Sequence, residues 1–464
     1  MTAAKKRQPK ALFLLCFTSM WECFSYYGMR ALLVLYMIGQ LSYTQADAFS
    51  IYGLYTMLVE LLAIAGGYCA DKIWGVRSSV FLGAVLIAIG HLFLALNAFP
   101  AMFFIGLGFI IVGSSFFKPN LKALLGSFYE KEDLRRDEGF TLFYTGMNVG
   151  GFLATVACGY AAQVFGWHIG FGLAGFGMLL GMGMLVAKRV LLNGKGNSPK
   201  GISWFKKVLC GVLTLIAVGI AALILRYHGE STYFAPLIGI GGLIYLFLQT
   251  KGVSFKEKRS IFIIVGSVFL LMIYFALDEL MGSLLAVFSS TYVSTQVGGI
   301  IVPSSVLIAA NPLTIILLGV VISKFSLKIS FFGKITTAFL FLAAGFFLLY
   351  MGTLFPNTAQ LVSVFFPLFS YVCIAVGELF IAPTIYAYCS REAPEHLKGM
   401  FMGLVALGFS YGSFFSGTLA QIVNPHTLND YTYLFLGIML FTLLLAASLK
   451  LFLKKRVVNV LELS

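Results

Sequence analysis

The sequence predicts an all-α integral membrane protein with about fourteen transmembrane helices. Of its 464 residues, 59% are hydrophobic and only 11% are charged, whereas a soluble domain carries about 25% charged residues. Apolar runs long enough to cross a hydrocarbon core of about 30 Å recur from end to end. They lie roughly at residues 12–38, 48–70, 78–97, 101–128, 140–165, 169–192, 206–226, 233–250, 260–290, 303–323, 332–353, 357–389, 397–422 and 431–453.

The net charge of +14 follows this topology. With the N-terminus inside, 28 of the 32 Lys and Arg residues fall in segments on the inner side of the membrane. Arg30, Lys118 and Lys122 lie within spans, and only Arg226 falls at an outer edge. This distribution obeys the positive-inside rule. It predicts a multi-pass protein of the inner cell membrane with both termini cytoplasmic, and a lipid partner instead of a nucleic acid.

Polar breaks predict the domain organisation. The N-terminus MTAAKKRQPK runs into the first span without a small-residue cleavage site, so we expect this helix to be retained. A Gly-, Ser-, Pro- and Lys-containing segment at 191–207 is typical of a linker. We therefore expect a six-helix half at 1–193, a linker with two inserted lipid-facing helices at 194–259, and a second six-helix half at 260–464, as in transporters built from repeats.

The first span carries a polar stripe on one helical face. A carboxylate and a guanidinium within such a span cost a few kcal/mol each, so the stripe is typical of a cavity through which a polar solute moves. For Arg30 the alternative is an anchor at the helix end, and for Tyr26 and Tyr27 it is packing. The stripe consists of Ser19, Glu22, Cys23, Tyr26, Tyr27 and Arg30.

Other spans carry further charges, and acids outnumber bases. Lys118 lies mid-span before a proline; a functional cation and a snorkelling lysine are the two interpretations. An unpaired carboxylate in apolar surroundings binds a proton more readily than in water, so a proton gradient can charge and discharge it. The intramembrane acids are Glu22, Glu60, Asp278, Glu279 and Glu378.

Other chemistries find no support in the sequence. The seven cysteines and five histidines form no metal-ligand spacing, and no phosphate-cradling loop for ATP is present. No intramembrane nucleophile has a base and an orienting partner within a recognisable pattern. We therefore expect neither a cofactor, a metal nor an enzymatic activity.

Several motifs carry a family resemblance. GGYCADKIWGVR at 66–77 resembles the loop motif of the major facilitator superfamily, through Gly67, Asp71, Gly75 and Arg77. The stretch 113–151, with FSYYGMR at 24–30, NPL at 311–313 and GELFIAP at 377–383, resembles the proton-dependent oligopeptide transporter family. The resemblance implies the major facilitator fold, with two six-helix halves plus two inserted helices. It also implies import of di- and tripeptides with protons by alternating access, and we expect a monomer.

The resemblance assigns roles to individual residues. A zwitterionic peptide needs a cation for its carboxylate, for which Lys118 and Arg30 are candidates. Glu378 matches the glutamate implicated in binding the amino end, and Glu279 matches a gating glutamate beside Asp278. Tyr26 and Tyr27 match cavity tyrosines, and Asn148 and Asn311 match asparagines that bind the peptide backbone, although a buried amide is often satisfied by a neighbouring backbone.

Departures from the family pattern keep the function open. Ser19 and Cys23 replace a Glu and an Arg linked to proton coupling, and Phe275 replaces a Trp. Glu60 stands where the family usually has Tyr, either as a replacement proton site or as a structural partner of Lys118 or Arg30. Alternatives to peptide transport are a carrier of another small solute, such as an amino acid or an anion, and a non-transporting membrane sensor. The other departures are Leu280, Val306 and Ile308.

Overall fold

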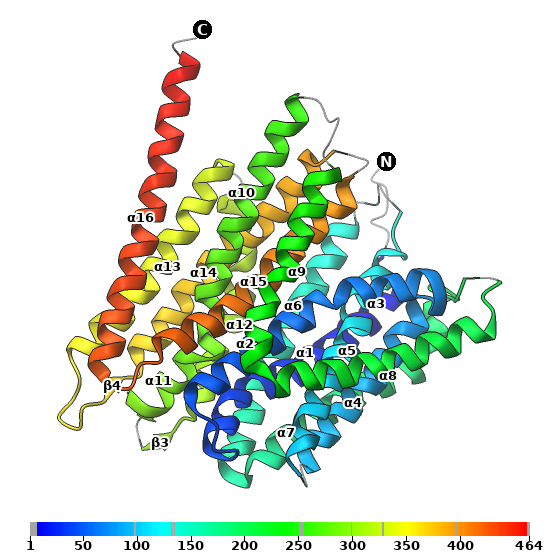
Figure 1. Ribbon diagram of the computed structural model, residues 1–464, viewed down its shortest axis with the longest axis horizontal. Helices are drawn as coiled ribbons and strands as arrows, with labels where there is room; N and C mark the ends of the chain where they lie inside the picture. Colours follow the sequence, from blue (N-terminus) through cyan, green and yellow to red (C-terminus); the bar gives the residue numbers. More distant parts are fainter. Residues whose placement is uncertain are drawn as a thin grey trace. The chain divides into compact units, whose positions relative to one another are not determined.

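The computed structural model describes residues 7–96, 99–130, 133, 135–199, 201–249, 255–297, 299–326, 329–394 and 397–461. The predicted all-α class is confirmed, and each of the fourteen predicted segments corresponds to helix (Figure 1). Within the described residues, twelve helices are long and apolar enough to cross a membrane. The segments 12–38 and 233–250 correspond to the two remaining long helices, α1 and α9.

The chain forms two compact units, and the first comprises Met1–Leu33 and Leu58–Tyr227. The helices α1 and α2 each continue from one unit into the other. The helical segments that begin in unit 1 or lie within it are α1 (Lys10–Gly39), α3 (Ala63–Cys69), η1 (Ala70–Trp74), α4 (Val76–Leu96), α5 (Pro100–Gly126), α6 (Arg135–Phe165), α7 (Trp167–Ala187), η2 (Arg189–Leu192) and α8 (Trp204–Arg226).

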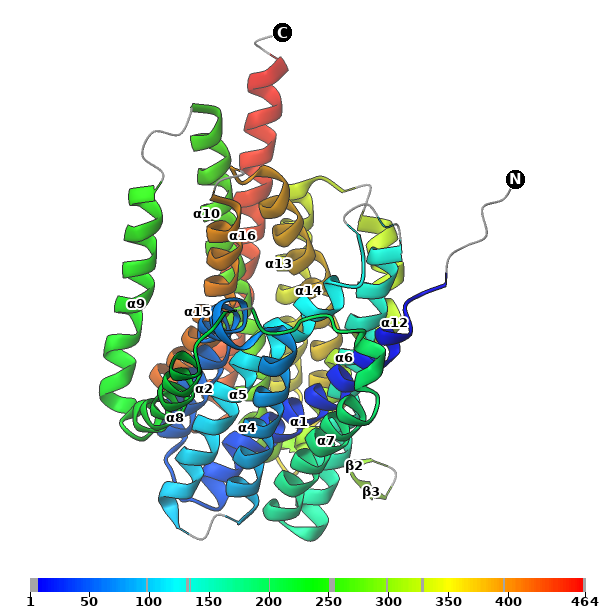
Figure 2. The ribbon, with the colours of Figure 1, turned by 90° about the vertical axis from the view of Figure 1, so that its right-hand side faces the viewer.

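Small residues let the helices of unit 1 approach closely. The helix α4 packs on α5 and α7 (Figure 2), and glycines recur seven residues apart on both α4 and α5. A Cβ atom on Gly83 would lie 2.6 Å from the Gly113 carbonyl oxygen, and one on Gly90 would lie 2.6 Å from that of Gly106. Because lipid tails are as apolar as leucine, such close packing replaces the hydrophobic effect as the force between membrane helices.

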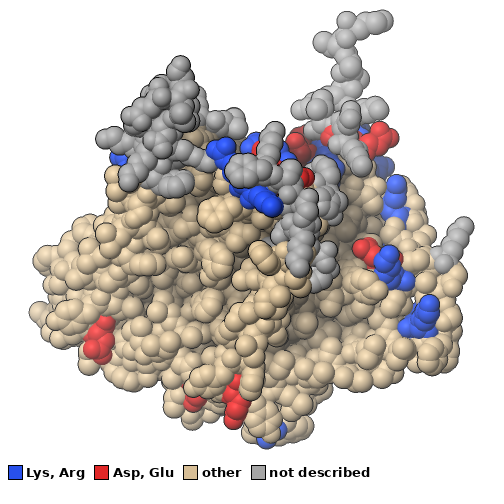
Figure 3. All heavy atoms as spheres, turned by 45° about the horizontal axis from the view of Figure 1, so that its top comes forward, with Lys and Arg blue, Asp and Glu red and all other residues tan. Residues whose placement is uncertain are grey.

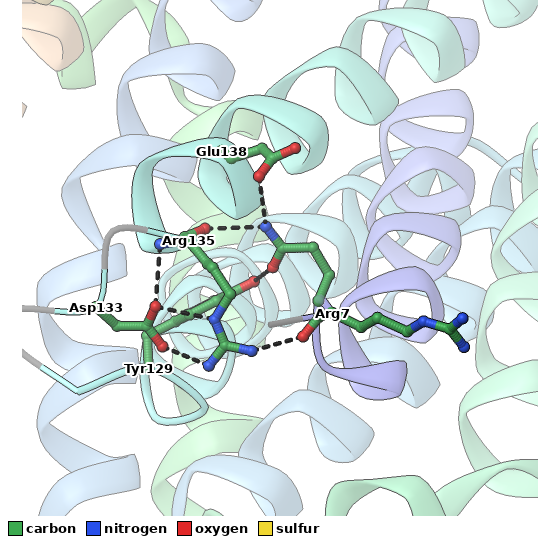
Figure 4. Close-up of polar contacts among 6 residues, drawn as sticks. Arg7, Tyr129, Asp133, Arg135 and Glu138 are labelled. Carbon is green, nitrogen blue, oxygen red and sulfur yellow. Dashed lines mark hydrogen bonds and ion pairs between the residues drawn. The ribbon is translucent and has the colours of Figure 1, made fainter. Parts of the chain in front are cut away.

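A polar network ties the start of the chain to the α5–α6 connection (Figure 4). The Arg135 guanidinium donates two hydrogen bonds to the Asp133 carboxylate, with N–O distances of 2.6 and 3.0 Å. It also donates to the Arg7 carbonyl. The Tyr129 hydroxyl donates to the Gln8 amide oxygen at 2.9 Å. Burial raises the pKa of the Tyr129 phenol, which therefore stays protonated as a donor at neutral pH. The network holds the entry of α6.

The second unit comprises Val34–Met57 and His228–Ser464. The hairpin Val34–Met57 packs on α15, where a Cβ on Gly53 would lie 3.0 Å from the Gly417 Cα and where the Ser410 hydroxyl donates to the Met57 carbonyl. Its helical segments are α2 (Gln45–Leu61, continuing into unit 1), α9 (His228–Gln249), α10 (Phe255–Asp278), η3 (Glu279–Gly282), α11 (Leu284–Tyr292), η4 (Ser304–Ala309), α12 (Ala310–Ser326), α13 (Phe331–Leu354), α14 (Phe365–Glu392), α15 (Lys398–Val423) and α16 (Leu428–Leu461).

One predicted boundary was wrong. The segment 357–389 begins as helix only at Phe365, because the Asn357 side-chain oxygen accepts from the amides of Ala359 and Leu361 and closes a turn. The strand β4 (Val362–Ser363) follows and pairs in parallel with β1 (Val293–Ser294). The strands β2 (Gln296–Val297) and β3 (Ile300–Ile301) form a short antiparallel hairpin.

Exposed apolar side chains cover the helices, as expected for contact with lipid. Many large hydrophobic residues are more than half exposed, among them Leu213, Leu317 and Leu444. Figure 3 shows a broad surface without charged side chains, with Lys, Arg, Asp and Glu gathered toward its edges. Such a surface is compatible with a hydrocarbon solvent and not with water.

We predict that Gly83→Ala destabilises the protein, because the added Cβ would meet backbone atoms of α5 at 2.6 and 2.7 Å. Overpacking of this kind costs about 1–3 kcal/mol. The matched control is Gly183→Ala on α7, where a Cβ meets nothing within 4 Å. Thermal unfolding of both detergent-purified variants measures the difference, and equal melting temperatures would contradict the packing argument.

Candidate functional site

Lys118 lies mid-helix on α5 and is held by side chains of α1 and α2. Its ammonium is 3.8 Å from the Glu60 carboxylate and 3.5 Å from the centre of the Tyr26 ring. The side chain of Lys118 is 20% exposed and that of Glu60 is 41% exposed. An ion pair and a cation–π contact together compensate the charge in an apolar span. We call Glu22, Tyr26, Glu60 and Lys118 the Lys118 group.

The local sequence explains why α5 presents Lys118 at this point. Pro119 lies inside α5 and has no N–H for the preceding turn. The Asn120 amide donates to the Phe116 carbonyl at 2.8 Å and to the Gly66 carbonyl of α3 at 3.3 Å. Asn120 thus ties the proline-interrupted turn to α3 and fixes the position of Lys118.

Glu22 is the most buried acid of the Lys118 group, at 2% exposure. One carboxylate oxygen accepts only from the Cys23 thiol, at 3.6 Å, and the other has no hydrogen-bond partner among the described residues. Lys118 and Lys122 lie near enough to act on its charge. Cys23 stands where the family has an arginine, and its thiol is a far weaker donor to Glu22 than a guanidinium would be.

The remaining predicted residues of unit 1 are less closely joined to Lys118. The Arg30 guanidinium lies 5.9 Å from the Tyr26 ring centre and 5.8 Å from that of Tyr27, which links it to the polar stripe of α1. The Asn148 amide donates to the Tyr144 carbonyl one turn earlier on α6, at 3.0 Å. This amide therefore has a backbone partner within its own helix.

A second group of polar side chains gathers in unit 2. The Asn311 amide of α12 donates to the Glu378 carboxylate of α14 at 3.4 Å, so two predicted residues are brought together. The Tyr274 hydroxyl of α10 donates to the Ile374 carbonyl at 2.6 Å, and Asp278 and Glu378 lie within electrostatic reach of it. Tyr274 was not singled out from the sequence, although it lies four residues before Asp278 and so on the same helical face.

The adjacent acids Asp278 and Glu279 mark a break in the helix. The α-helix α10 ends at Asp278, and Glu279 begins the 3₁₀ turn η3. Asp278 is buried at 6% exposure. Glu279 accepts from the Tyr52 hydroxyl of α2 at 3.4 Å, a contact across 227 residues of sequence. The carboxylate of Glu279 therefore connects η3 to the hairpin Val34–Met57.

The loop motif is covered by the predicted linker. Gly75 has φ +80°, and a Cβ there would lie 2.5 Å from the Ser198 backbone nitrogen. The Arg77 amide donates to the Gly196 carbonyl at 2.8 Å, and the Ser198 hydroxyl donates to the Trp74 carbonyl. Gly67 has open space around it, and Asp71 lies in the π turn η1 with an exposed side chain. The linker is thus docked on the motif, which the sequence did not reveal.

Membrane-length helices with charged residues held inside them are typical of a membrane transporter. The chain belongs to the POT family, whose match covers residues 77–434. The family resemblance and the major facilitator fold predicted from the motifs are therefore confirmed. As a member of this family the protein is a multi-span membrane transporter and not an enzyme.

Similar proteins cover nearly the whole chain. It is 31% identical over 440 residues to the uncharacterized transporter YclF of Bacillus subtilis (strain 168), which covers 90% of this chain and 87% of that protein. It is 27% identical over 460 residues to dipeptide and tripeptide permease A of Edwardsiella piscicida, covering 95% and 93%. A solved peptide transporter POT in complex with sulfate is 29% identical with a TM-score of 0.84, covering 98% of this chain and 96% of that one. A POT family transporter in complex with 5-aminolevulinic acid is 28% identical with a TM-score of 0.83, covering 96% and 97%.

We predict that Gly75→Ala loosens the docked linker, because the Cβ would collide with the Ser198 backbone and the φ angle is strained for alanine. Gly201→Ala is the matched control, since Gly201 has φ +78° but nothing within 4 Å. Limited trypsin digestion, followed by mass spectrometry of cleavage after Lys195, measures linker release. Equal cleavage rates in the two variants would show that the Ser198 contact does not hold the linker.

Proposed function

We propose that this protein imports di- and tripeptides together with protons by alternating access. The Lys118 ammonium, held inside an apolar helix by a pair 3.8 Å long, is the observation that carries the proposal. Its family and the name of the permease from Edwardsiella piscicida support the peptide class. We further propose that the protein is a monomer in the inner cell membrane. The distribution of Lys and Arg predicts that both of its termini lie in the cytoplasm.

The two polar groups suit the two ends of a zwitterion. In this proposal Lys118 binds the peptide carboxylate, with Arg30 as a second cation. Glu378 binds the peptide ammonium, and Asn311 and Asn148 bind the peptide backbone. Tyr26 and Tyr27 line the path. The peptide ammonium carries a full positive charge and the Asn311 amide does not, so the ammonium adds an ion pair to the hydrogen bond that it makes with Glu378.

Proton coupling follows from the shared lysine. Glu60 and Glu22 both act on Lys118. When a peptide carboxylate takes over the ammonium, a glutamate of the Lys118 group loses its compensating charge in apolar surroundings and takes up a proton. Asp278 and Glu279 are the proposed gate, because Glu279 accepts from Tyr52 on the hairpin Val34–Met57.

A second candidate is the same fold carrying another small amino acid or anion. Two observations favour it: Glu22 has the thiol of Cys23 in place of a guanidinium partner, and a POT family transporter is known in complex with 5-aminolevulinic acid. A carrier for an amino acid needs the same two opposite charges at a different spacing, whereas a carrier for an anion needs only the cation.

The proposed function is tested with proteoliposomes that take up labelled dialanine under an acid-outside pH gradient. We predict uptake by the unmodified protein and a loss of more than tenfold in Lys118→Ala, because the peptide carboxylate loses its cation. Lys122→Ala is the control, since that exposed lysine lies one turn away and should retain most uptake. Absence of dialanine uptake with retained uptake of a free amino acid would replace the peptide proposal with the second candidate.

We predict that Glu378→Gln removes the preference for a free amino terminus. The amide keeps a hydrogen-bonding side chain near Asn311 but has no charge for the ammonium. Competition of dialanine with its N-acetylated analogue measures the preference, and Glu392→Gln at the exposed end of the same helix is the control. An unchanged preference in Glu378→Gln would count against its role.

We predict that Glu60→Gln uncouples the transporter. Exchange of substrate across the membrane should continue, because exchange moves no net protons, while uphill uptake driven by the pH gradient should fail. If Glu60 only neutralises Lys118, exchange, uphill uptake and thermal stability should fall together, since a lone buried charge is costly. Full gradient-driven uptake would contradict both interpretations and leave Glu22, Glu279 and Glu378 as the proton carriers.

A further inference from the structure

A surface groove of about 380 Å³ runs along the inserted helix α8 within unit 1. We call it the α8 groove. Its walls come from α3, η1, α5 and α8, and α8 packs on α5 (Figure 1). Small side chains open it, and large exposed ones edge it, with Tyr68 at 63% and Leu213 at 54% exposure. Residues that line it include Ala65, Cys69, Val112, Phe116, Leu213 and Ala217.

The wall of the α8 groove is chemically suited to hydrocarbon. The Ser115 hydroxyl donates to the Val112 carbonyl at 2.7 Å, and the Thr214 hydroxyl donates to the Cys210 carbonyl at 2.8 Å. The adjacent Trp74 indole donates to the Cys210 sulfur at 3.1 Å. Because the Ser115 and Thr214 hydroxyls already have backbone partners, they require no hydrogen bond from an occupant, which suits a lipid tail.

One charged side chain lies among the described residues that line the groove, and it stands at one end. Lys206 belongs to the first turn of α8, is exposed, and forms no ion pair with a described residue. Trp204 and Phe205 beside it are 77% and 69% exposed, as is typical of residues at the headgroup level of a bilayer. The lining continues along α8 to Ala217, about 16 Å away at 1.5 Å per residue. This length matches one leaflet of a core about 30 Å thick.

We propose that the α8 groove binds one anionic phospholipid of the inner leaflet, with its phosphate on Lys206 and an acyl chain against Cys69, Leu213 and Ala217. The lysine supplies charge complementarity, the satisfied walls accept the chain, and the groove length fits one leaflet. This inference does not rest on the transported substrate.

A second groove, in unit 2, can be compared with the α8 groove. The other inserted helix, α9, borders a groove of about 270 Å³ with α10 and α15, lined by residues such as Ile240, Met272 and Leu407. No charged side chain is among the described residues that line it, and the Tyr411 hydroxyl donates to the Ala235 carbonyl at 2.8 Å. This groove has room for hydrocarbon but offers no cation, so we expect no headgroup preference there.

The test uses the full chain in detergent micelles and measures quenching of tryptophan fluorescence by lipids with brominated acyl chains. Trp74 and Trp204 flank the α8 groove and report its occupancy. We expect brominated phosphatidylglycerol to reach half-maximal quenching at a concentration about tenfold lower than brominated phosphatidylcholine. Unbrominated phosphatidylglycerol should reverse the quenching and should raise the melting temperature.

Two neighbouring lysines distinguish a specific lipid site at Lys206 from a general attraction of anionic lipid to positive charge. Lys206→Gln should abolish the preference for phosphatidylglycerol, while Lys207→Gln, which removes the same charge outside the lining, should retain it. Ala217→Phe should weaken quenching by both lipids because it fills the groove. Equal quenching by the two lipids, or equal losses in the two lysine variants, would overturn the proposal. Displacement by inorganic phosphate as effective as that by lipid would also overturn it, since the site would then bind the anion alone.

Discussion

The structure depends on one constraint, the compensation of the Lys118 ammonium inside an apolar helix. The charge is met by Glu60 of α2 and by the Tyr26 ring of α1, so side chains from three helices converge on one ammonium. A pair at 3.8 Å is longer than the 2.7–2.9 Å of a charge-assisted hydrogen bond. The ammonium is therefore compensated without being saturated, which leaves it able to exchange partners. In the proposed function, a stronger pair would hold the ammonium more tightly and hinder its transfer to a substrate carboxylate.

The fold class could be predicted from the sequence because membrane helices are recognised by their length and apolar composition. Each predicted segment corresponds to helix in the structure. It failed at 357–364, where a local Asx turn and a pairing with β1, almost seventy residues earlier, override apolar composition. The charged residues of the candidate site could be singled out from the sequence because each is costly in a span, and their roles stay predictions. Glu60 was one expected partner of Lys118. The Asn311–Glu378 and Tyr52–Glu279 contacts were not expected, because they cross 67 and 227 residues and no periodicity carries such information.

The linker shows why a motif is more than its own residues. The glycine at position 75 permits a positive φ and also allows the Ser198 backbone to lie against it. The composition of residues 194–198 is typical of a flexible linker. In the structure, however, the Gly196 carbonyl and the Ser198 hydroxyl form hydrogen bonds with backbone groups of the motif loop. The inserted helix α8 then begins directly after this docked segment. The insertion is thereby joined to unit 1 through both hydrogen bonds and helix packing.

The Lys118 group places two acids around one ammonium, and this arrangement orders the proposed cycle. In the proposed cycle, a peptide carboxylate that arrives at Lys118 takes the ammonium from these acids, and proton uptake by one of them becomes favourable. In unit 2 the Asn311 amide donates to Glu378 and the Tyr52 hydroxyl donates to Glu279, each at 3.4 Å. In this proposal the proton that accompanies the substrate is taken up at the Lys118 group, by Glu60 or Glu22.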